Sequence, residues 1–228
     1  MQPKLKLPSV TLITVTSVDI EKTNAALLHC CTCAEFGAVK MLCSQPPRLR
    51  HPQIQYIAIP SIDFLGYSRF IIEDLNKFVE TEHCLIVQAD GFIVDPARWQ
   101  PRFLKFDYIG APWPEYVGLN GPGHQRFRFG KNRVGNGGFS LRSKKLLEAT
   151  AQIRFDQLNL PIKSEDIVIC HYYFADLRSA GIRFAPSTLA ARFSIEIATG
   201  NATLNSVFGF HGKHWLPAVY RAYPWLQV

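Results

Sequence analysis

A carboxylate and an imidazole that lie far apart in this sequence could act together on a phosphate-bearing ligand. Asp90 offers hard oxygen atoms, and His211, in a glycine-containing segment, offers a ring nitrogen. Together they could hold a divalent cation such as Mn²⁺ or Mg²⁺, with phosphate oxygens and water completing the coordination shell. Each residue also has a simpler interpretation. Asp90 and Gly91 could form a turn that closes a strand, and His211 could be a loop histidine without a role.

The residues before Asp90 indicate where this carboxylate lies. Residues 84–87 are apolar without alternation, which is typical of a strand buried on both faces of a mostly parallel sheet. The carboxyl end of such a strand is where open α/β sheets bind their ligands. Gly91 allows the backbone to turn tightly or a ligand to approach closely. The pattern therefore predicts a binding site at Asp90.

Strands and helices alternate along the chain and predict an α/β fold, with helices flanking a mostly parallel central sheet. The predicted strands cover residues 10–16, 39–43, 54–59, 84–88, 108–111 and 182–185, and the glycine-rich segment 134–138 leads into another. The predicted helices cover 19–36, 67–81, 144–152 and 165–179, with Asp19, Ser143 and Ser164 as N-caps and Gly37 and Gly181 as stops. Because no repeat or linker is visible, residues 1–228 are predicted to form a single domain.

Two further groups of charged residues have both a functional and a structural interpretation. Glu165 and Asp166 begin a predicted helix, where the helix dipole favours carboxylates in any protein. The segment 114–134 shows no periodicity and combines glycines with basic side chains at Arg126, Arg128 and Lys131. Such a long irregular segment is typical of a mobile lid, and its cations could close over phosphates. A disordered surface insertion is the alternative.

The composition is that of an ordinary globular protein and limits the classes of partner. Of the 228 residues, 47% are hydrophobic and 19% are charged, and the net charge is +7. This charge is compatible with phosphate-bearing ligands, with peripheral association at an anionic membrane surface, or with nucleic acid. Residues 1–8 lack the apolar core of a signal peptide, so a cytoplasmic protein is expected. The six cysteines are expected to be buried free thiols rather than metal ligands or redox residues.

Several motifs, in their order along the chain, resemble those of the GT-A class of nucleotide-sugar glycosyltransferases. They are more closely similar to a mostly uncharacterised bacterial and fungal family of small glycosyltransferase-like domains. The residues that carry the resemblance are Gln88–Gly91, Tyr108–Trp113, Gly135–Arg142, Ser164–Asp166 and Gly209–Gly212. The first strand and helix fit such a fold only generically. The resemblance implies a single GT-A-like, Rossmann-like domain.

The resemblance implies a site for a metal ion and a diphosphate. Gln88, Ala89 and Asp90 occupy the place of the Asp-x-Asp motif, so Asp90 would bind the Mn²⁺ or Mg²⁺ that bridges the donor diphosphate. Gln88 departs from the motif because its amide supplies no carboxylate, which leaves the strictness of metal dependence open. His211 matches the C-terminal histidine that completes the metal shell in this class.

The resemblance also implies residues for catalysis and for the donor. Asp166 matches the acid that deprotonates the acceptor hydroxyl in inverting members, with Glu165 as the next candidate. The residues implied to contact the nucleotide sugar are Thr14, Val15, Thr16, Gln88, Asp90, Gly137, Gly138 and Lys213.

These implications predict a hexosyltransferase-type glycosyltransferase of polysaccharide biosynthesis. It would move a sugar from a nucleotide-diphosphate donor, expected to be a UDP-sugar, to a hydroxyl group of a carbohydrate or glycolipid acceptor, with inversion and metal assistance. Gln88 keeps a second hypothesis open, a catalytically inactive sugar-nucleotide-binding domain. A basic nucleic-acid-binding protein is the third, but the cations are scattered and no nucleic-acid motif is visible.

Overall fold

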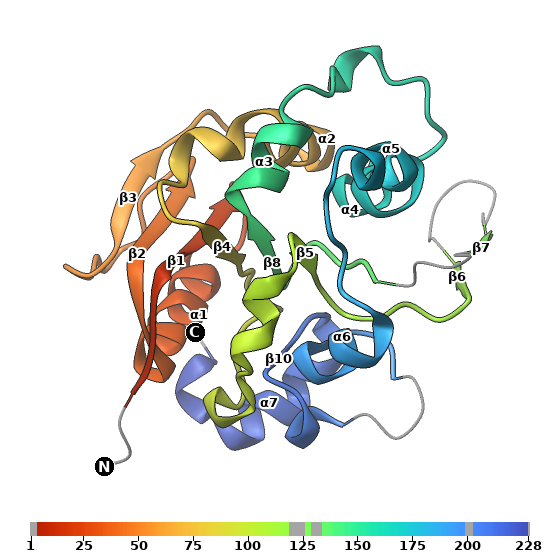
Figure 1. The fold of residues 1–228 in the computed structure, drawn as a ribbon. Coiled ribbons are helices and arrows are strands. Elements are labelled where there is room, and N and C mark those ends of the chain that lie inside the picture. Colours follow the sequence, from red (N-terminus) through yellow and green to blue (C-terminus); the bar gives the residue numbers. More distant parts are fainter. Residues whose placement is uncertain (1–3, 119–125, 129–133, 199–202, 228) are drawn as a thin grey trace.

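A six-stranded sheet lies at the centre of the computed structural model, which describes residues 4–118, 126–128, 134–198 and 203–227. Its strands follow the order β3 (Gln55–Ala58), β2 (Ala34–Cys43), β1 (Leu5–Thr16), β4 (His83–Ile86), β8 (Ser140–Ser143) and β5 (Tyr108–Ile109). β8 pairs antiparallel with both of its neighbours, and the other pairs are parallel (Figure 1). The carboxyl ends of β1 and β4 therefore meet at one edge of the sheet.

Helices cover both faces of the sheet because alternate residues of each central strand point to opposite sides. Leu12 and Leu85 belong to the core that contains α1 (Ile20–Cys33), whereas Ile13 and Ile86 pack with the helical segment 64–78. That segment runs through α2 (Phe64–Arg69), a π-helix (Phe70–Asp74) and a 3₁₀ helix (Leu75–Phe78). This layered arrangement, seen in Figure 1, confirms the predicted α/β fold with a mostly parallel sheet.

The chain after β4 is built from short elements. The helices are α3 (Lys144–Thr150), α4 (Glu165–Ile167), a π-helix (Val168–Tyr172), α5 (Phe174–Ser179), α6 (Ser187–Phe193) and α7 (Leu216–Ala222). Two small sheets pair β6 (Tyr116–Gly118) with β7 (Arg126–Arg128), and β9 (Ser194–Ile195) with β10 (Gly209–Phe210). Short 3₁₀ helices cover 96–98, 101–105, 155–157, 204–206, 213–215 and 224–226.

The first helix is shorter than predicted because the chain passes from it directly into β2. α1 ends at Cys33 rather than at Phe36, and the first residues of β2 pair with the beginning of β1, which is itself longer than predicted. Gly37 therefore does not stop a helix. It lies within β2, where a Cβ atom would stand 2.2 Å from the carbonyl oxygen of Pro8, so only glycine fits this close approach.

The predicted helix caps differ in outcome. Ser143 Oγ accepts a hydrogen bond from Leu146 N at 3.0 Å and caps α3 as predicted. Asp19 precedes α1 in the left-handed region, with φ of 49°, and its side chain makes no capping bond, so that prediction was wrong. Ser164 makes no backbone cap either: its hydroxyl donates to the Asp166 carboxylate, and that carboxylate accepts the backbone N–H of Ile167.

Two other segments differ from their predicted structure. Part of 114–134 is not irregular: β6 and β7 form an antiparallel ribbon there, and Arg128 Nε lies 3.0 Å from Glu115 Oε1. Lys131 and the side chain of Arg126 lie outside the described residues, so closure of this segment over phosphates stays a prediction. The predicted strand 182–185 forms only one bridge, between Tyr108 and Phe184, before the chain turns into α6.

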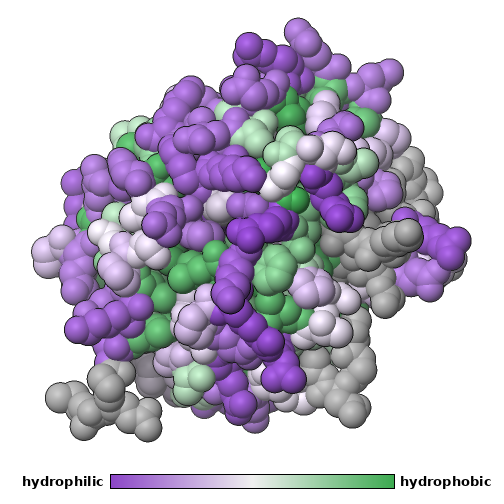
Figure 2. All heavy atoms as spheres, viewed as in Figure 1, coloured by the Kyte–Doolittle hydropathy of each residue, from purple (hydrophilic) through white to green (hydrophobic). Residues whose placement is uncertain are grey.

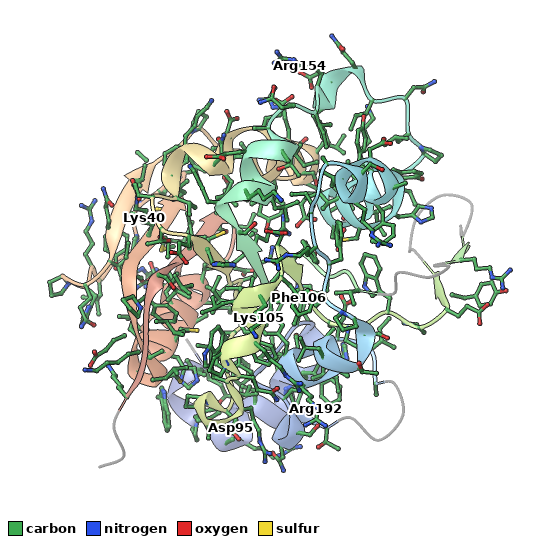
Figure 3. The ribbon with its side chains drawn as sticks, in the orientation of Figure 1. Lys40, Asp95, Lys105, Phe106, Arg154 and Arg192 are labelled. Carbon is green, nitrogen blue, oxygen red and sulfur yellow. The ribbon has the colours of Figure 1, made fainter. Side chains whose placement is uncertain are left out.

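Polar side chains dominate the face shown in Figure 2, with apolar patches between them. Within the described part of the chain, no helix is long and apolar enough to span a bilayer. All six cysteines are free, and only Cys33 is not fully buried, which agrees with the prediction of buried thiols. Lys40, labelled in Figure 3, is a buried cation on β2 whose Nζ lies 2.6 Å from Glu80 Oε2, so it serves the fold rather than a ligand.

Candidate functional site

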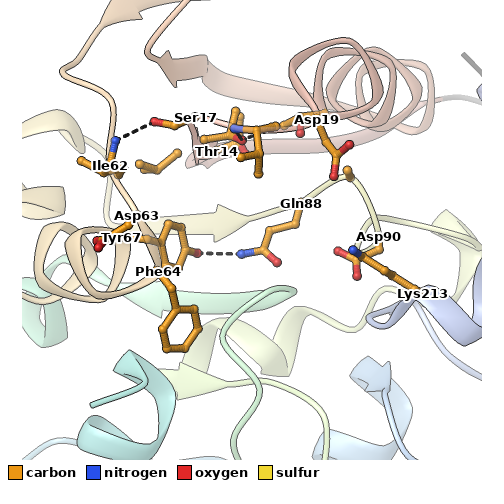
Figure 4. A pocket seen from close by; sticks show the side chains of 15 residues that line it. Thr14, Ser17, Asp19, Ile62, Asp63, Phe64, Tyr67, Gln88, Asp90 and Lys213 are labelled. Carbon is orange, nitrogen blue, oxygen red and sulfur yellow. Dashed lines mark hydrogen bonds between the residues drawn. The ribbon is translucent and has the colours of Figure 1, made fainter. Parts of the chain in front are cut away.

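A cleft of about 430 Å³ opens where β1 and β4 end. Most of the residues implied to contact the donor line it, namely Thr14, Val15, Thr16, Gln88, Asp90 and Lys213, together with Ser17, Val18, Asp19, Thr23, Ile62, Asp63, Phe64, Tyr67 and Ala89. In Figure 4, Tyr67 and Phe64 lie on one side of the cleft and Asp90 and Lys213 on the other. Thr14 Oγ1 is buried and has no hydrogen-bond partner among the described residues, so a ligand could satisfy it.

A tight turn after β4 holds Asp90 at this cleft. The backbone groups of Gln88 and Gly91 close the turn with hydrogen bonds of 2.9 and 3.1 Å. A Cβ on Gly91 would lie 2.9 Å from both Gly138 O and His211 Cδ2, so glycine is required where these three segments meet. The strand-closing turn therefore exists, and it presents the Asp90 carboxylate to the cleft.

A pair of short parallel strands places His211 beside Asp90. β9 and β10 end together, and His211 N donates to Ile195 O at 2.9 Å. The chain after β10 is then fixed to the turn by a 2.8 Å hydrogen bond from Gly212 N to Asp90 O. As a result, His211 Nε2 lies 3.8 Å from Asp90 Oδ1. The expected proximity of the two side chains is therefore observed, while metal binding itself stays a prediction.

Gln88 adds a third donor atom at the same point. Its Nε2 donates to Tyr67 OH at 2.9 Å (Figure 4). Its Oε1 is thereby directed to the other side and lies 3.2 Å from His211 Nε2. No group of three or more His, Cys, Asp or Glu side chains in the described part of the chain could hold a metal ion. The amide oxygen, the Asp90 carboxylate and the imidazole nevertheless form a donor set that suits Mn²⁺ or Mg²⁺. The residues present therefore fit such an ion, with phosphate and water as further ligands.

The electrostatics at His211 favour positive charge. Burial opposes the charged ring, but the hydrogen bond and the charge of Glu196 outweigh burial and raise the pKa of His211, with smaller contributions from Asp90 and Asp166. Burial also opposes the charge of Glu196. Other effects outweigh burial and lower the pKa of this carboxyl below its usual range, and the largest of them is the hydrogen bond with His211. The carboxylates around the ring therefore stabilise a positive charge at this point of the site, which a proton on the ring can supply.

The glycine-rich segment before β8 passes close to both acidic regions. A Cβ on Gly137 would lie 1.7 Å from Glu165 Oε1, and one on Gly138 would lie 2.1 Å from His211 Nε2. The preceding residue, Asn136, is buried in the left-handed region with φ of 64°, and its Nδ2 lies 2.9 Å from His211 Nδ1. Gly137 and Gly138 are thus placed beside the candidate catalytic and metal-binding side chains rather than in the lining of the cleft.

The two predicted catalytic acids have different surroundings. Glu165 Oε1 lies 2.7 Å from Arg142 Nη2, and the exposed fractions of these two side chains are only 4% and 0%. Burial and the charge of Asp166 raise the pKa of Glu165 to about 7, against the opposing effect of Arg142. Asp166 is half-buried and accepts hydrogen bonds from Gly137 N at 3.2 Å and Ile167 N at 2.8 Å. Glu165 is therefore held in a buried ion pair, whereas Asp166 keeps contact with solvent.

Several residues of the site were not singled out from the sequence. Glu196 contacts His211, Tyr67 orients Gln88, and Phe64 lines the cleft. Glu196 directly follows β9, and because this strand has only two residues, the sequence carried no signal for it. The two aromatic residues gave no signal, because aromatic side chains at the start of an amphipathic helix ordinarily belong to the core.

The fold of this chain was compared with those of solved structures. The galactosyltransferase LgtC, in complex with donor and acceptor sugar analogs, matches with a TM-score of 0.50 and 11% identity, over 89% of this chain and 87% of that chain. An active-site mutant of LgtC matches with a TM-score of 0.50 and 13% identity over the same shares. A glycosyltransferase involved in glycosylation of the major capsid of PBCV-1 matches with a TM-score of 0.48 and 12% identity, over 90% of this chain and 92% of that chain. The LgtC matches show that this chain has a glycosyltransferase fold of the GT-A type.

The family follows from the sequence itself. Residues 54–211 match a family described as "Protein of unknown function (DUF5672)", and because this match covers more than half of the chain, the protein belongs to that family. A comparison with curated proteins finds no match. The matched range contains the candidate metal-binding and catalytic residues, namely Gln88, Asp90, Glu165, Asp166 and His211, and also Glu196, which contacts His211.

Proposed function

We propose that this chain is a glycosyltransferase that moves a sugar from a UDP-linked donor to a hydroxyl group of a carbohydrate or glycolipid acceptor. The observation that carries the proposal is the convergence of Gln88, Asp90 and His211 at a cleft of a glycosyltransferase fold. A diphosphate requires positive charge around it, and Lys213 lines the same cleft. These features support a donor whose phosphates lie between the turn after β4 and the chain after β10.

The part of the cleft beside α2 suits a nucleoside. Phe64 lines it with 66% of its surface exposed, and an exposed aromatic ring offers a face on which a base can stack. Thr14 Oγ1 offers an unused hydrogen-bonding group at the end of β1. A base and ribose here would leave the diphosphate directed toward Asp90, which lines the same cleft.

Asp90, His211 and Gln88 would hold Mn²⁺ or Mg²⁺, and a bound ion would stabilise the negative charge that develops on the leaving diphosphate. Lys213 supplies a further cation from the protein itself. Since Gln88 takes the place of a carboxylate, these residues provide one negative charge fewer than an Asp-x-Asp motif. The ion is therefore expected to bind weakly alone and more tightly together with the donor phosphates.

Asp166 is the better candidate for the base in an inverting transfer. A base must reach the acceptor hydroxyl within hydrogen-bonding distance. Asp166 is half-buried beside Gly137 and close enough to contribute to the raised pKa of His211. Glu165 could reach a substrate only by breaking its buried ion pair with Arg142. We therefore propose that Glu165 has a structural role through its ion pair with Arg142, and that Asp166 abstracts the proton.

The rival hypotheses make different demands on the site. An inactive binding domain needs the cleft but not Asp166. A nucleic-acid-binding surface needs a continuous basic stripe, whereas Lys105, Arg154 and Arg192 lie on separate parts of the face in Figure 3. These three cations therefore do not form such a stripe on this face.

The test compares two isosteric substitutions. Asp90→Asn is expected to weaken Mn²⁺-dependent binding of UDP, measured by calorimetric titration, and to reduce turnover with it. Asp166→Asn is expected to leave UDP binding unchanged and to lower sugar transfer about 10²–10⁴-fold, the usual effect of a lost general base. Transfer is followed as UDP release in single turnovers with a panel of UDP-hexoses and simple glycoside acceptors.

The parent protein and Glu148→Gln, an exposed residue of α3, serve as controls. UDP binding without transfer to any acceptor would favour the inactive binding domain. Parent-like transfer by Asp166→Asn would remove this residue from the mechanism. The anomeric configuration of the product, read by proton NMR, decides between inversion and retention.

A further inference from the structure

The two most exposed large hydrophobic side chains of the described chain belong to segments that meet at the start of α1. Leu49 is 81% exposed and Val18 is 69% exposed. Arg48 N donates to Glu21 Oε1 at 2.9 Å, which joins the loop that carries Leu49 to the first turn of α1, directly after the segment that carries Val18. Exposed apolar side chains that gather on one part of a protein commonly mark a contact surface.

Hydrogen bonds fix the backbone at both positions. Asn24 Nδ2 donates to Leu49 O at 3.1 Å, and Val18 N donates to Thr16 Oγ1 at 3.2 Å. Neither Leu49 nor Val18 belongs to the apolar cores of the described residues. The two side chains are therefore held outward by an ordered backbone, and burying them requires a partner from outside the fold.

Cations surround these apolar side chains. Lys22, Arg48 and Arg50 are exposed, and none of them forms a salt bridge with the residues that the structure describes. Two carboxylates lie nearby, but Glu21 already accepts the Arg48 N–H and Asp19 lines the cleft. The surface therefore combines apolar side chains with an excess of positive charge.

We propose that this apolar–basic surface, formed by Val18, Lys22, Arg48, Leu49 and Arg50, binds an anionic lipid bilayer. Apolar side chains that enter the boundary between headgroups and acyl chains, with cations at the level of the headgroups, hold proteins at such a surface. Two aliphatic side chains are too few for the apolar centre of a protein–protein interface, which typically covers about 800 Å² on each partner. They would also add nothing to the binding of a nucleic-acid backbone, which depends on charge. A bilayer is the partner that uses both properties of the surface.

The position of Val18 connects this surface with the candidate functional site. Val18 also lines the cleft at the end of β1, so a chain docked through this surface holds the mouth of the cleft at the membrane. A glycolipid acceptor then presents its hydroxyl group to the cleft without leaving the bilayer. This choice of acceptor rests on the proposed function, whereas binding to the bilayer does not.

The test measures sedimentation of the full chain with sucrose-loaded vesicles, in the absence of UDP, metal and acceptor. Vesicles of equal parts phosphatidylglycerol and phosphatidylcholine are expected to bind the parent protein, and vesicles of phosphatidylcholine alone are expected to bind it much more weakly. Leu49→Ser is expected to weaken binding about tenfold, because one leucine side chain stays in water. Arg48→Gln and Arg50→Gln are each expected to weaken it about fivefold, and added salt should weaken binding of the parent protein.

Matched variants elsewhere on the chain serve as controls. Tyr116→Ser removes an apolar side chain that is 47% exposed on the β6–β7 ribbon, and Arg154→Gln with Arg178→Gln removes two exposed cations. These changes are expected to leave vesicle binding within about twofold of the parent value, because cations far from the docked surface are screened. Circular dichroism verifies that each variant is folded.

Three results would overturn the inference. The first is a parent protein that does not sediment with the anionic vesicles. The second is equal binding by the parent, Leu49→Ser and the two arginine variants. The third is a loss with the arginine variants but not with Leu49→Ser, together with tighter binding of the parent to duplex DNA in fluorescence anisotropy, which would assign the cations to nucleic acid. Because no donor or acceptor is present, a failure of sugar transfer and a failure of this inference are distinguishable.

Discussion

Arg142→Met is expected to destabilise the fold strongly, because it leaves the Glu165 carboxylate buried without its cation. The ion pair is 2.7 Å long, and its side chains are 0% and 4% exposed. Two unit charges at this distance attract by about 6 kcal/mol in an effective dielectric constant of 20, and their desolvation offsets part of this. We expect the free energy of unfolding to fall by about 3–5 kcal/mol near pH 8.

A double variant separates the charges from the packing. Arg142→Met combined with Glu165→Leu replaces both charges by apolar groups, a change that is often neutral or stabilising. We expect its free energy of unfolding to lie within about 1 kcal/mol of the parent value. Urea unfolding followed by circular dichroism measures all three proteins, and calorimetry should show intact UDP binding, because neither residue lines the cleft.

Acid provides an independent check on the same pair. A protonated Glu165 needs no counter-ion, so the loss caused by Arg142→Met should shrink when unfolding is measured near pH 5. The reasoning is refuted if the single variant loses less than about 1 kcal/mol near pH 8, well below the cost of a broken buried pair. It is also refuted if the double variant is as unstable as the sum of its single variants.

Three further predictions concern individual positions. Gly138→Ala is expected to abolish Mn²⁺-dependent UDP binding in calorimetry, because its Cβ would stand 2.1 Å from His211 Nε2; Gly66→Ala, whose nearest contacts would be at 3.1 Å, is the control. Gln88→Glu is expected to tighten Mn²⁺ binding about tenfold through its added charge, and an unchanged affinity in EPR titration would place residue 88 outside the coordination shell. The pKa of Glu165 is raised from 4.5 to about 7, so the folded chain keeps a proton that the unfolded chain loses. The resulting stability is present below about pH 4.5 and is lost by about pH 7, an effect of at most about 3 kcal/mol. In urea titrations of Glu165→Gln at a series of pH values, the free energy of unfolding should not show this decrease.

The central sheet could be predicted because its strands carry continuous apolar runs. Residues 84–87 are buried on both faces, as their composition indicates, and the position of Asp90 at the carboxyl end of β4 follows directly. The antiparallel direction of β8 could not be predicted, since a four-residue strand has the same local pattern in either direction. The early end of α1 was also beyond prediction, because it depends on pairing between β2 and a distant part of β1.

The site was predictable only where residue type and motif order were informative. Asp90 and His211 are recognisable from their chemistry, and the structure brings them together. Glu196 follows a two-residue strand that is too short to show any periodicity, and its role arises only when β9 pairs with β10. The dipole of a helix accounts for an acid at position 165 but not for its burial, which depends on contact with Arg142 of β8.

The hydrogen bond from Gly212 N to Asp90 O gives the protein a built-in reporter of local opening. This 2.8 Å bond joins the chain that carries His211 to the turn that carries Asp90. If the C-terminal segment detaches while the sheet stays folded, this amide exchanges with solvent deuterium although the amides of β4 remain protected. The difference between the two exchange rates then measures how often the imidazole and the carboxylate are separated, independently of any ligand.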